Sequence, residues 1–274
     1  MVKKKIIITG GNSGIGLELT KKLLSENHQI GLVLKNQNRK NDLQKVVETK
    51  NIDFFYGDLS KQSEVVKVGN EIIDKWGSLD ILYNNAGVLL DQVYLSEKGN
   101  EMHFEVNTLA PLILSRTLRE RTDKNSKLVI INSVTDYLHR QKKIISETLL
   151  SPKKNKKLFG AYLQSKLSLV LLMNDWAKND KNLHILSIAP GPTKTKMTSG
   201  SGMPLWALPL RHLFFSKPST AATYLFKAGF SEEFLNKENI FIQKNTIHNF
   251  LFELDIHTKE KLLKRIKVQI PFHV

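Results

Sequence analysis

The sequence predicts an α/β fold: one doubly wound, parallel sheet of about seven strands with helices on both faces. Short apolar runs alternate with helical patterns almost from end to end, which is typical of such sheets. The run at 128–132, Leu-Val-Ile-Ile-Asn, has the composition of a strand buried on both faces. No linker is long enough to separate two domains, and 274 residues suffice for one large domain. We therefore expect a single domain over residues 1–274.

The individual elements follow from the local patterns. Strands are expected at residues 5–9, 29–34, 53–56, 79–83, 128–132, 184–188 and 240–243. Helices are expected at residues 14–25, 39–50, 60–75, 96–118, 162–177, 205–215, 219–230 and 253–267. Ser60 is expected to cap its helix, Ser96 to begin the next one, and Pro111 to kink or break it.

Two stretches do not fit the alternation. Residues 134–157 are polar, rich in lysine and poorly periodic, and residues 194–204 are small and polar. Both follow strands, at the edge where open α/β sheets bind ligands, so they are candidate substrate loops or lids. A plain solvent loop is the alternative for each.

Composition excludes several classes of function. There is no cysteine, which rules out disulfides, thiolate metal sites and cysteine nucleophiles and fits a reducing cytoplasm. The net charge is +15, but the lysines are scattered, which favours a solvated surface over a nucleic-acid interface. Histidines are dispersed without metal-ligand spacing. The Gly-x-Ser-x-Gly motif that would indicate a serine hydrolase is absent from the sequence. No signal peptide or membrane-length apolar run is visible, so we expect a cytoplasmic protein without an integral membrane segment.

The first strand runs into a glycine-rich turn and then a helix, Thr9-Gly10-Gly11-Asn12-Ser13-Gly14-Ile15-Gly16. Glycines permit positive φ and close approach of a ligand, and the N–H groups of a helix N-terminus favour a phosphate. The spacing is Gly-x-x-x-Gly-x-Gly rather than the commonest dinucleotide fingerprint. For the turn alone, an ordinary strand-to-helix connection is the less favoured alternative.

Seven motifs in order carry a family resemblance. They are Thr9-Gly10-x-x-x-Gly14-Ile15-Gly16, Asp58-Leu59, Asn84-Asn85-Ala86-Gly87, Asn107, Ser133, Tyr162-x-x-x-Lys166 and Pro190-Gly191-x-Thr193. Together, over residues 3 to about 245, they resemble the short-chain dehydrogenase/reductase family, whose fold is of the Rossmann type. Tyr-x-x-Ser-Lys-Leu at 162–167 and the wide gap after Ser133 are similar to its retinol-dehydrogenase-like and protochlorophyllide-reductase-like members. The resemblance implies a cofactor-binding and catalytic core at 3–193, with a substrate loop and C-terminal region at 194–274.

Tyr162 and Lys166 are the candidate catalytic pair. Four residues apart, they share one helical face, and a nearby ammonium would lower the pKa of a phenol toward the operating range. The resemblance implies that Tyr162 is the acid/base, Ser133 orients the substrate, Lys166 holds the nicotinamide ribose, and Asn107 supports a water-linked proton relay. A helix-surface contact is the alternative for an isolated Tyr-x-x-x-Lys pair.

The resemblance also implies which residues hold the cofactor. Glycines of the turn would surround a diphosphate, and Asp58 and Leu59 would lie at the adenine. Residues 85–87 would line the ribose and nicotinamide side, and residues 190–193 would meet the carboxamide. The expected cofactor-binding set is Thr9, Gly10, Asn12, Ser13, Gly14, Ile15, Gly16, Lys35, Arg39, Asp58, Leu59, Asn85, Ala86, Gly87, Tyr162, Lys166, Pro190, Gly191 and Thr193.

The end of the second strand bears on cofactor choice. It reads Leu34-Lys35-Asn36-Gln37-Asn38-Arg39, without the carboxylate that would bind a ribose 2′-hydroxyl. Lys35 and Arg39 are candidates for a 2′-phosphate, so we expect NADP(H), with NAD(H) as the alternative.

These features favour an NADP(H)-dependent carbonyl reductase or alcohol dehydrogenase acting on a small, apolar substrate in a pocket built by residues 88–95, 134–157 and 194–215. An NADP(H)-binding regulatory or scaffold protein is the alternative, and epimerisation or dehydration a third. Relatives associate through helices equivalent to 97–120 and 158–178, which implies a homodimer or homotetramer. The apolar stripe of the last helix, from Leu262 to Ile270, is expected to dock on the sheet, with a membrane surface or a partner as the alternative.

Overall fold

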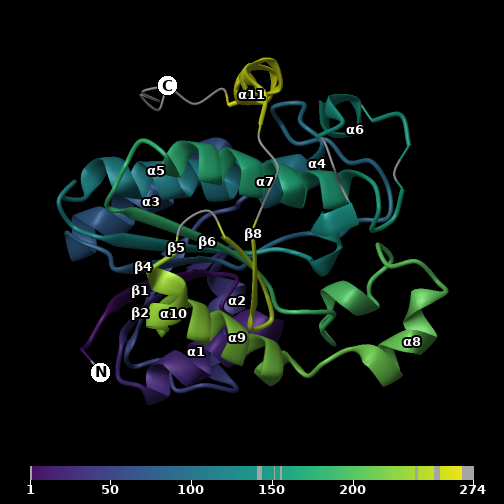
Figure 1. The fold of residues 1–274 in the computed structure, drawn as a ribbon. Coiled ribbons are helices and arrows are strands. Elements are labelled where there is room, and N and C mark those ends of the chain that lie inside the picture. The colour runs from purple at the N-terminus through teal and green to yellow at the C-terminus, as the bar shows by residue number, and fades with distance from the viewer. Residues whose placement is uncertain are drawn as a thin grey trace.

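A mostly parallel sheet of eight strands crosses the centre of the protein in the order β3-β2-β1-β4-β5-β6-β7-β8 (Figure 1). The computed structural model describes residues 2–140, 144–150, 152–154, 156–237, 240–249 and 254–266. The strands are β1 (Lys5–Thr9), β2 (Gln29–Leu34), β3 (Ile52–Tyr56), β4 (Ile81–Asn84), β5 (Leu128–Ser133), β6 (Leu183–Ala189), β7 (Ile240–Gln243) and β8 (Thr246–Asn249). Neighbours from β3 to β7 pair in parallel.

The prediction of about seven strands omitted β8. This strand returns from β7 through a hairpin at Lys244 and pairs with it antiparallel. It is a four-residue edge strand, Thr-Ile-His-Asn, with a single aliphatic residue, so it lacks the apolar run that marked the buried strands. The predicted parallel, doubly wound architecture is otherwise confirmed.

Two helical layers cover the sheet, as Figure 1 shows. One contains α3 (Gln62–Trp76), α5 (Ala110–Arg121) and α7 (Ala161–Ala177), and the other contains α1 (Gly14–Ser25) and α9 (Pro218–Phe230). The alternation of side chains along a strand divides β1 between two apolar cores: Ile7 joins the first layer, and Ile6 and Ile8 join the second. Burial on both faces is the reason for the continuous apolar runs of these strands.

Two predicted helix starts are wrong. The Ser60 N–H and hydroxyl both donate to Asp58 Oδ1 (3.0 and 2.8 Å), so Ser60 closes a turn and α3 begins at Gln62. Ser96 donates its hydroxyl to Glu105 Oε2 (2.7 Å) in a separate turn. The next helix, α4 (Met102–Phe104), is instead capped by the Glu101 carboxylate, which accepts the N–H groups of residues 103 and 104.

The predicted interruption near Pro111 is present as a change of helix type. A π-helical turn at Glu105–Leu109 joins α4 to α5, and Pro111 lies at the start of α5, where its missing N–H is tolerated. Single π turns inside helices are frequent at functional sites. This one carries Asn107.

The remaining elements are short or displaced from their predicted bounds. They are α2 (Gln37–Gln44), a 3-10 turn at Asp136–Arg140, α6 (Ser146–Leu150), a 3-10 turn at Met197–Ser199, α8 (Ala207–Phe214), α10 (Glu232–Leu235) and α11 (Ile256–Leu263). The expected ends of the last helix, at 253 and 267, lie outside the described residues. Nowhere in the described ranges is a helix both long and apolar enough to cross a membrane.

The last helix, α11, packs through Leu262, which is fully buried in the first core. Lys259 forms an ion pair with Asp175 of α7 (2.9 Å), and Lys261 donates to Ser146 of α6 (2.9 Å). The predicted docking therefore occurs on the helical layer rather than directly on the strands. Val268 and Ile270 of the predicted stripe lie outside the described residues.

Candidate active site

The glycine turn after β1 forms a cradle at the N-terminus of α1. Gly10 and Gly14 have positive φ (67° and 55°), which side chains other than glycine rarely adopt. A Cβ on Gly16 would overlap the Gly10 carbonyl oxygen and lie 2.5 Å from Asn85 Nδ2. Ser13 precedes α1 and makes no side-chain capping bond, so the turn presents first-turn N–H groups suited to an anion.

Thr9 joins this turn to the end of β4. Its hydroxyl oxygen accepts the N–H groups of Asn85 (3.1 Å) and Ala86 (3.0 Å), and Asn85 Nδ2 donates to the Thr9 carbonyl (3.0 Å). Strand order reverses between β1 and β4, and ligands of open α/β sheets bind at such a point. Thr9 thus fixes the geometry of the crevice without lining it.

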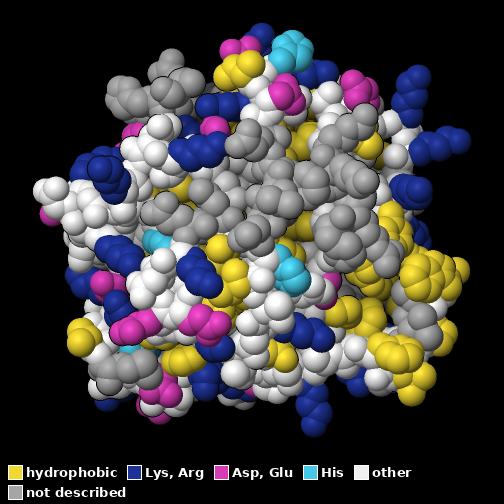
Figure 2. All heavy atoms as spheres, in the orientation of Figure 1, with side chains coloured by type: hydrophobic (Ala, Val, Ile, Leu, Met, Phe, Trp, Pro, Cys, Tyr) yellow, Lys and Arg dark blue, Asp and Glu magenta, His cyan; other side chains and the backbone are white. Residues whose placement is uncertain are grey.

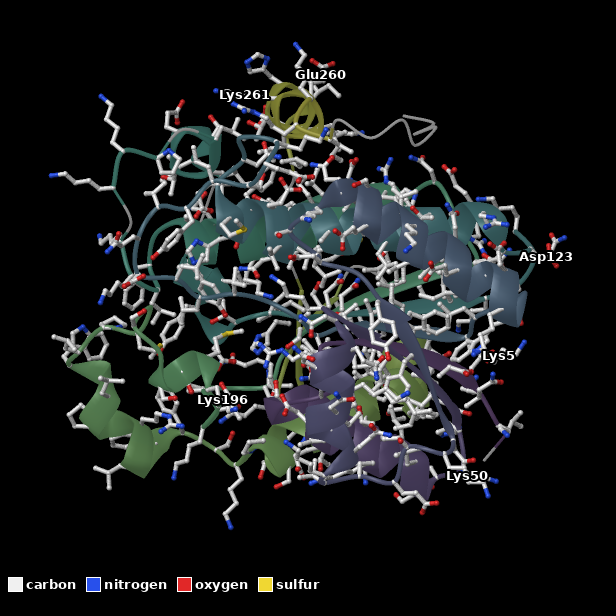
Figure 3. The ribbon with its side chains drawn as sticks, turned by 180° about the vertical axis from the view of Figure 1, so that it is seen from behind. Lys5, Lys50, Asp123, Lys196, Glu260 and Lys261 are labelled. Carbon is white, nitrogen blue, oxygen red and sulfur yellow. The ribbon has the colours of Figure 1, made fainter. Side chains whose placement is uncertain are left out.

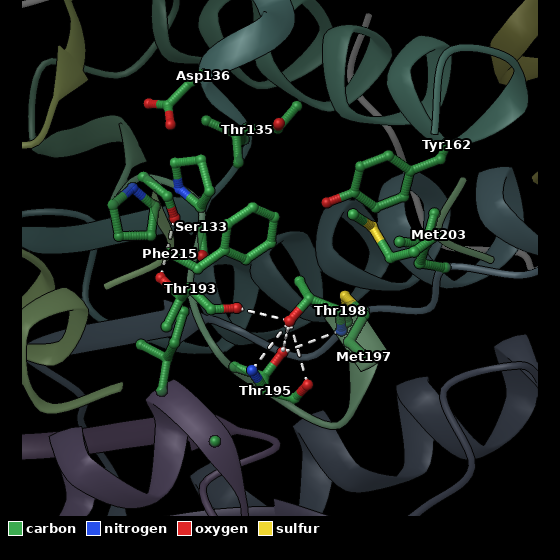
Figure 4. A pocket seen from close by; sticks show the side chains of 18 of the residues that line it. Ser133, Thr135, Asp136, Tyr162, Thr193, Thr195, Met197, Thr198, Met203 and Phe215 are labelled. Atoms are coloured by element: carbon green, nitrogen blue, oxygen red, sulfur yellow. Dashed lines mark hydrogen bonds between the residues drawn. The ribbon is translucent and has the colours of Figure 1, made fainter. Parts of the chain in front are cut away.

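A cavity of about 490 Å³ opens at this edge of the sheet, within the range of small-molecule sites. The predicted residues that line it are Gly10, Ser13, Gly14, Ile15, Gly16, Asn85, Ala86, Gly87, Ser133, Tyr162, Lys166, Pro190, Gly191 and Thr193. Figure 4 shows the Tyr162 ring pointing into this cavity, toward the side on which Ser133 lies. Residues remote in sequence therefore converge here.

Lys166 and Asn107 brace the wall beside Tyr162. Lys166 Nζ donates to the carbonyl of Ser133, the last residue of β5 (2.9 Å). Asn107 exchanges two hydrogen bonds with the Val88 backbone: Nδ2 donates to the carbonyl (3.0 Å), and Oδ1 accepts the N–H (2.8 Å). A Cβ on Gly87 would lie 3.0 Å from Asn107 Oδ1 and 3.4 Å from Lys166 Nζ, so the glycine permits this approach.

Burial controls the protonation of both groups. Burial, with a smaller effect of the Asp136 carboxylate, raises the pKa of Tyr162 to about 12, and burial lowers the pKa of Lys166 to about 8. The expectation that Lys166 lowers the pKa of Tyr162 is therefore wrong for the protein alone. At neutral pH the Tyr162 phenol keeps its proton and is competent as a general acid.

Six predicted cofactor residues lie outside this cavity lining: Thr9, described above, and the five that follow. Lys35 Nζ pairs with Asp58 Oδ2 (2.7 Å) at the ends of β2 and β3, and Arg39 is exposed on α2. Burial would raise the pKa of Asp58, but hydrogen bonds from Lys35 and Ser60 outweigh it and hold that pKa below its usual value. Asn12 is partly buried in the glycine turn, and Leu59 packs against the first core.

Residues 194–204, a candidate substrate loop or lid from the sequence, contribute to the cavity wall and are called the lid here. The sequence did not predict which of these residues line the cavity. Thr198 Oγ1 donates to the Thr193 carbonyl (2.6 Å) and accepts the Thr195 N–H (3.0 Å), bonds drawn in Figure 4. A Cβ on Gly202 would overlap the Leu89 carbonyl oxygen, so the lid closes against the opposite wall. Further lining residues are Leu89, Val134, Thr135, Asp136, Tyr137, Leu158, Pro192, Thr195, Lys196, Met197, Thr198, Met203, Trp206, Phe214 and Phe215.

A buried histidine behind Tyr162 was also not identified from sequence. The His103 ring lies edge-on to Tyr162 with centroids 6.1 Å apart. His103 Nε2 accepts the Leu90 N–H (2.9 Å), which leaves Nδ1 to donate to Glu101 (2.7 Å). No group of three histidine or acidic side chains within the described ranges could hold a metal.

Comparison with known proteins agrees with this geometry. The family model described as short chain dehydrogenase matches residues 4–203. The chain is 31% identical to a short-chain dehydrogenase, chyC, of Penicillium rubens over 204 residues (72% of this chain and 74% of the relative). It is 30% identical to human retinol dehydrogenase 12 over 215 residues (75% and 67%), which supports the predicted branch.

A solved structure shares the fold. The NADPH-bound carbonyl reductase from chicken fatty liver superposes with a TM-score of 0.67 at 18% identity, covering 91% of this chain and 100% of that one. The chain therefore belongs to the short-chain dehydrogenase/reductase family and is an NAD(P)-dependent oxidoreductase acting on CH–OH and C=O groups.

Proposed function

We propose that this protein is an NADP(H)-dependent carbonyl reductase or alcohol dehydrogenase for a small, apolar substrate. The carrying observation is that Tyr162, Ser133 and Lys166 converge in the cavity that begins at the glycine turn. Apolar side chains from three separate segments, Leu89, Leu158 and Met203, form much of the remaining wall, which supports an apolar substrate.

The residues present fit a nicotinamide dinucleotide. The glycine turn is a cradle that a Cβ on Gly16 would fill, and the N-terminus of α1 suits a diphosphate. When bound, the cofactor supplies or accepts the hydride. On this proposal the remaining predicted residues contact the adenine, the ribose and the nicotinamide, as the family resemblance implies. They are Asp58, Leu59, Asn85, Ala86, Gly87, Pro190, Gly191 and Thr193.

Side chains of the protein itself carry out the proton transfer to the substrate oxygen. Tyr162, protonated at neutral pH, donates its phenolic proton to the substrate oxygen, and the Ser133 hydroxyl hydrogen-bonds the same oxygen. Lys166, anchored on the Ser133 carbonyl, stabilises the phenolate that forms. Asn107 holds the Val88 backbone beside Lys166 and supports the water-linked return of the proton.

The test of this function is turnover of a panel of aldehydes, ketones and quinones with NADPH. Tyr162→Phe should lower kcat by about 100-fold or more while NADPH binding persists, because general acid catalysis contributes at least that much. Tyr137→Phe is the matched control, since that tyrosine lines the same cavity and should retain most activity. Unchanged turnover in Tyr162→Phe contradicts the mechanism, and NADPH binding without any turnover favours the regulatory alternative.

The preference for NADP(H) rests on Lys35, which lies at the end of β2 where no carboxylate is present. Lys35→Ala should raise KM for NADPH by about tenfold and leave KM for NADH nearly unchanged, because one charge-assisted contact to a 2′-phosphate is lost. The same measurement on Arg39→Ala shows whether Arg39, rather than Lys35, contacts the 2′-phosphate. Equal effects of Lys35→Ala on both cofactors would contradict the assignment.

We also propose a cytoplasmic homo-oligomer that associates through α5 and α7. Family resemblance supports this part of the proposal. Sedimentation velocity of the full chain gives the mass, and a monomer at micromolar concentration would contradict it.

A further inference from the structure

The mouth of the cavity carries exposed apolar side chains. Leu205, Trp206, Leu213 and Phe214 are between 61% and 78% exposed, and all lie on α8 or its approach. Figure 2 shows hydrophobic side chains gathered over this part of the surface. Exposed apolar residues scattered singly are ordinary, but a group of large ones marks an interaction surface.

This patch belongs to the entrance of the site. Trp206 and Phe214 line the cavity although most of each side chain faces solvent. They therefore form part of the rim of the cavity, where it meets solvent.

Lysines of the basic stretch 134–157 come just before a residue of the cavity wall. Leu158 lines the cavity, and Lys153, Lys154 and Lys156, just before it, are exposed. Figure 2 shows Lys and Arg side chains projecting beside the hydrophobic group on the same edge of the molecule. On the lid, Lys196 is also exposed and lies on the side of α8 in Figure 3, whereas Lys50 lies on the opposite side.

We propose that the face formed by Leu205, Trp206, Leu213 and Phe214 together with Lys153, Lys154 and Lys156 docks reversibly on anionic lipid bilayers and presents the cavity mouth to the membrane. Tryptophan, phenylalanine and leucine surrounded by lysine are the composition of an interfacial membrane-binding surface. Lysines near an anionic bilayer add electrostatic attraction, whereas two copies of this lysine-rich face would repel each other. The inference goes beyond the proposed function, and its test needs no turnover.

The experiment is co-sedimentation of the full chain with vesicles of phosphatidylcholine alone or mixed with phosphatidylglycerol. We expect binding to the anionic vesicles, weakened by salt, with a blue shift of the tryptophan emission that Trp206→Phe removes. Leu205→Asp/Leu213→Asp should lower the partition coefficient by about tenfold or more through lost apolar burial. Lys153→Glu/Lys154→Glu should lower it by a similar factor through lost attraction.

Val46→Asp/Lys50→Glu is the matched control, since both residues are exposed, Lys50 lies on the side away from α8 in Figure 3, and Val46 precedes it by four residues. It should bind like the wild type. Circular dichroism checks that each variant is folded, and because the substituted leucines do not line the cavity, NADPH binding should be retained.

Three outcomes would overturn the proposal: absent binding to anionic vesicles, binding that the leucine variant leaves unchanged, or equal losses in the control. Self-association that Leu205→Asp/Leu213→Asp abolishes, measured by sedimentation velocity without lipid, would assign the patch to a second copy instead. Failure of NADPH turnover with intact vesicle binding would contradict the proposed function alone.

Discussion

Burial displaces the pKa values of Tyr162 and Lys166 in opposite directions. It disfavours the charged form of each, so the phenol holds its proton more firmly and the ammonium less firmly. Lys166 donates a hydrogen bond to the Ser133 carbonyl, which offers no full negative charge to the ammonium. The protein alone thus keeps the acid protonated and leaves Lys166 near its titration range at mildly alkaline pH.

This predicts a pH dependence of stability. Between about pH 8 and 10 the unfolded chain keeps the Lys166 proton that the folded chain loses, so this group raises the free energy of unfolding as pH rises. Tyr162 opposes the trend only above pH 10, because its folded pKa lies above its ordinary value. From pH 7 to about pH 9.5, the wild type should gain about 2 kcal/mol relative to Lys166→Met.

Urea denaturation of both proteins without cofactor, at each pH, measures this difference. The other lysines are present in both proteins, so their contributions cancel in the difference between the wild type and Lys166→Met. Parallel stability curves would show that Lys166 titrates in the folded protein as an ordinary lysine.

At the scale of elements, two short irregular segments position the site. The glycine turn brings the N-terminus of α1 to the end of β4, and the π turn at Glu105–Leu109 aims Asn107 at Val88. The glycine turn contributes little apolar burial, whereas the π turn buries Val106 and Leu109. Each depends on close backbone contact, so a single added methyl group disturbs it.

Gly16→Ala tests the cradle. Its Cβ would overlap the Gly10 carbonyl oxygen, so α1 must move away from the turn. We expect a loss of about 1–3 kcal/mol in the free energy of unfolding, as overpacking typically costs, and NADPH binding weakened at least tenfold.

Gly200→Ala is the matched control. Gly200 has a φ of −81°, and the nearest atoms to an added Cβ are 3.5 Å away, so the methyl group fits. Calorimetry and cofactor titration should therefore leave this variant close to the wild type. Normal NADPH affinity in Gly16→Ala would contradict the role of the cradle.

At the scale of the whole molecule, the sheet order determines where chemistry can occur. The crevice lies where the strand order reverses between β1 and β4, and a helical layer covers each face of the sheet. On one face α9 packs against the sheet so closely that Gly229 meets the Tyr83 hydroxyl. That hydroxyl is buried without a hydrogen-bond partner in the described part of the chain, and burial raises the pKa of Tyr83.

A double-mutant cycle tests this contact. Tyr83→Phe removes a buried, unpartnered hydroxyl and should stabilise the protein by about 1 kcal/mol. Gly229→Ala should destabilise the wild type by about 1–3 kcal/mol, and less when Tyr83→Phe has made room. Urea denaturation of the four proteins gives the coupling energy, and strictly additive effects would show that Gly229 does not meet this hydroxyl.

The sequence by itself determined the architecture and about half of the polar side chains that line the cavity. Strands such as β5 and β6 are buried on both faces, so their apolar runs are local and visible. The glycine turn and the Tyr162–Lys166 pair have local spacings that their geometry requires, and Ser133 was assigned through the family resemblance. These features could be read without knowing what packs against them.

Only the tertiary structure decided the rest, because it depends on contacts between distant segments. The hydroxyls of Ser60 and Ser96 hydrogen-bond to Asp58 and Glu105 instead, so neither serine starts a helix as predicted. The protonation of Tyr162 was decided by burial, which no spacing reveals. The lid against Leu89 and the exposed side chains of α8 beside lysines from another segment likewise arise only when the chain is folded.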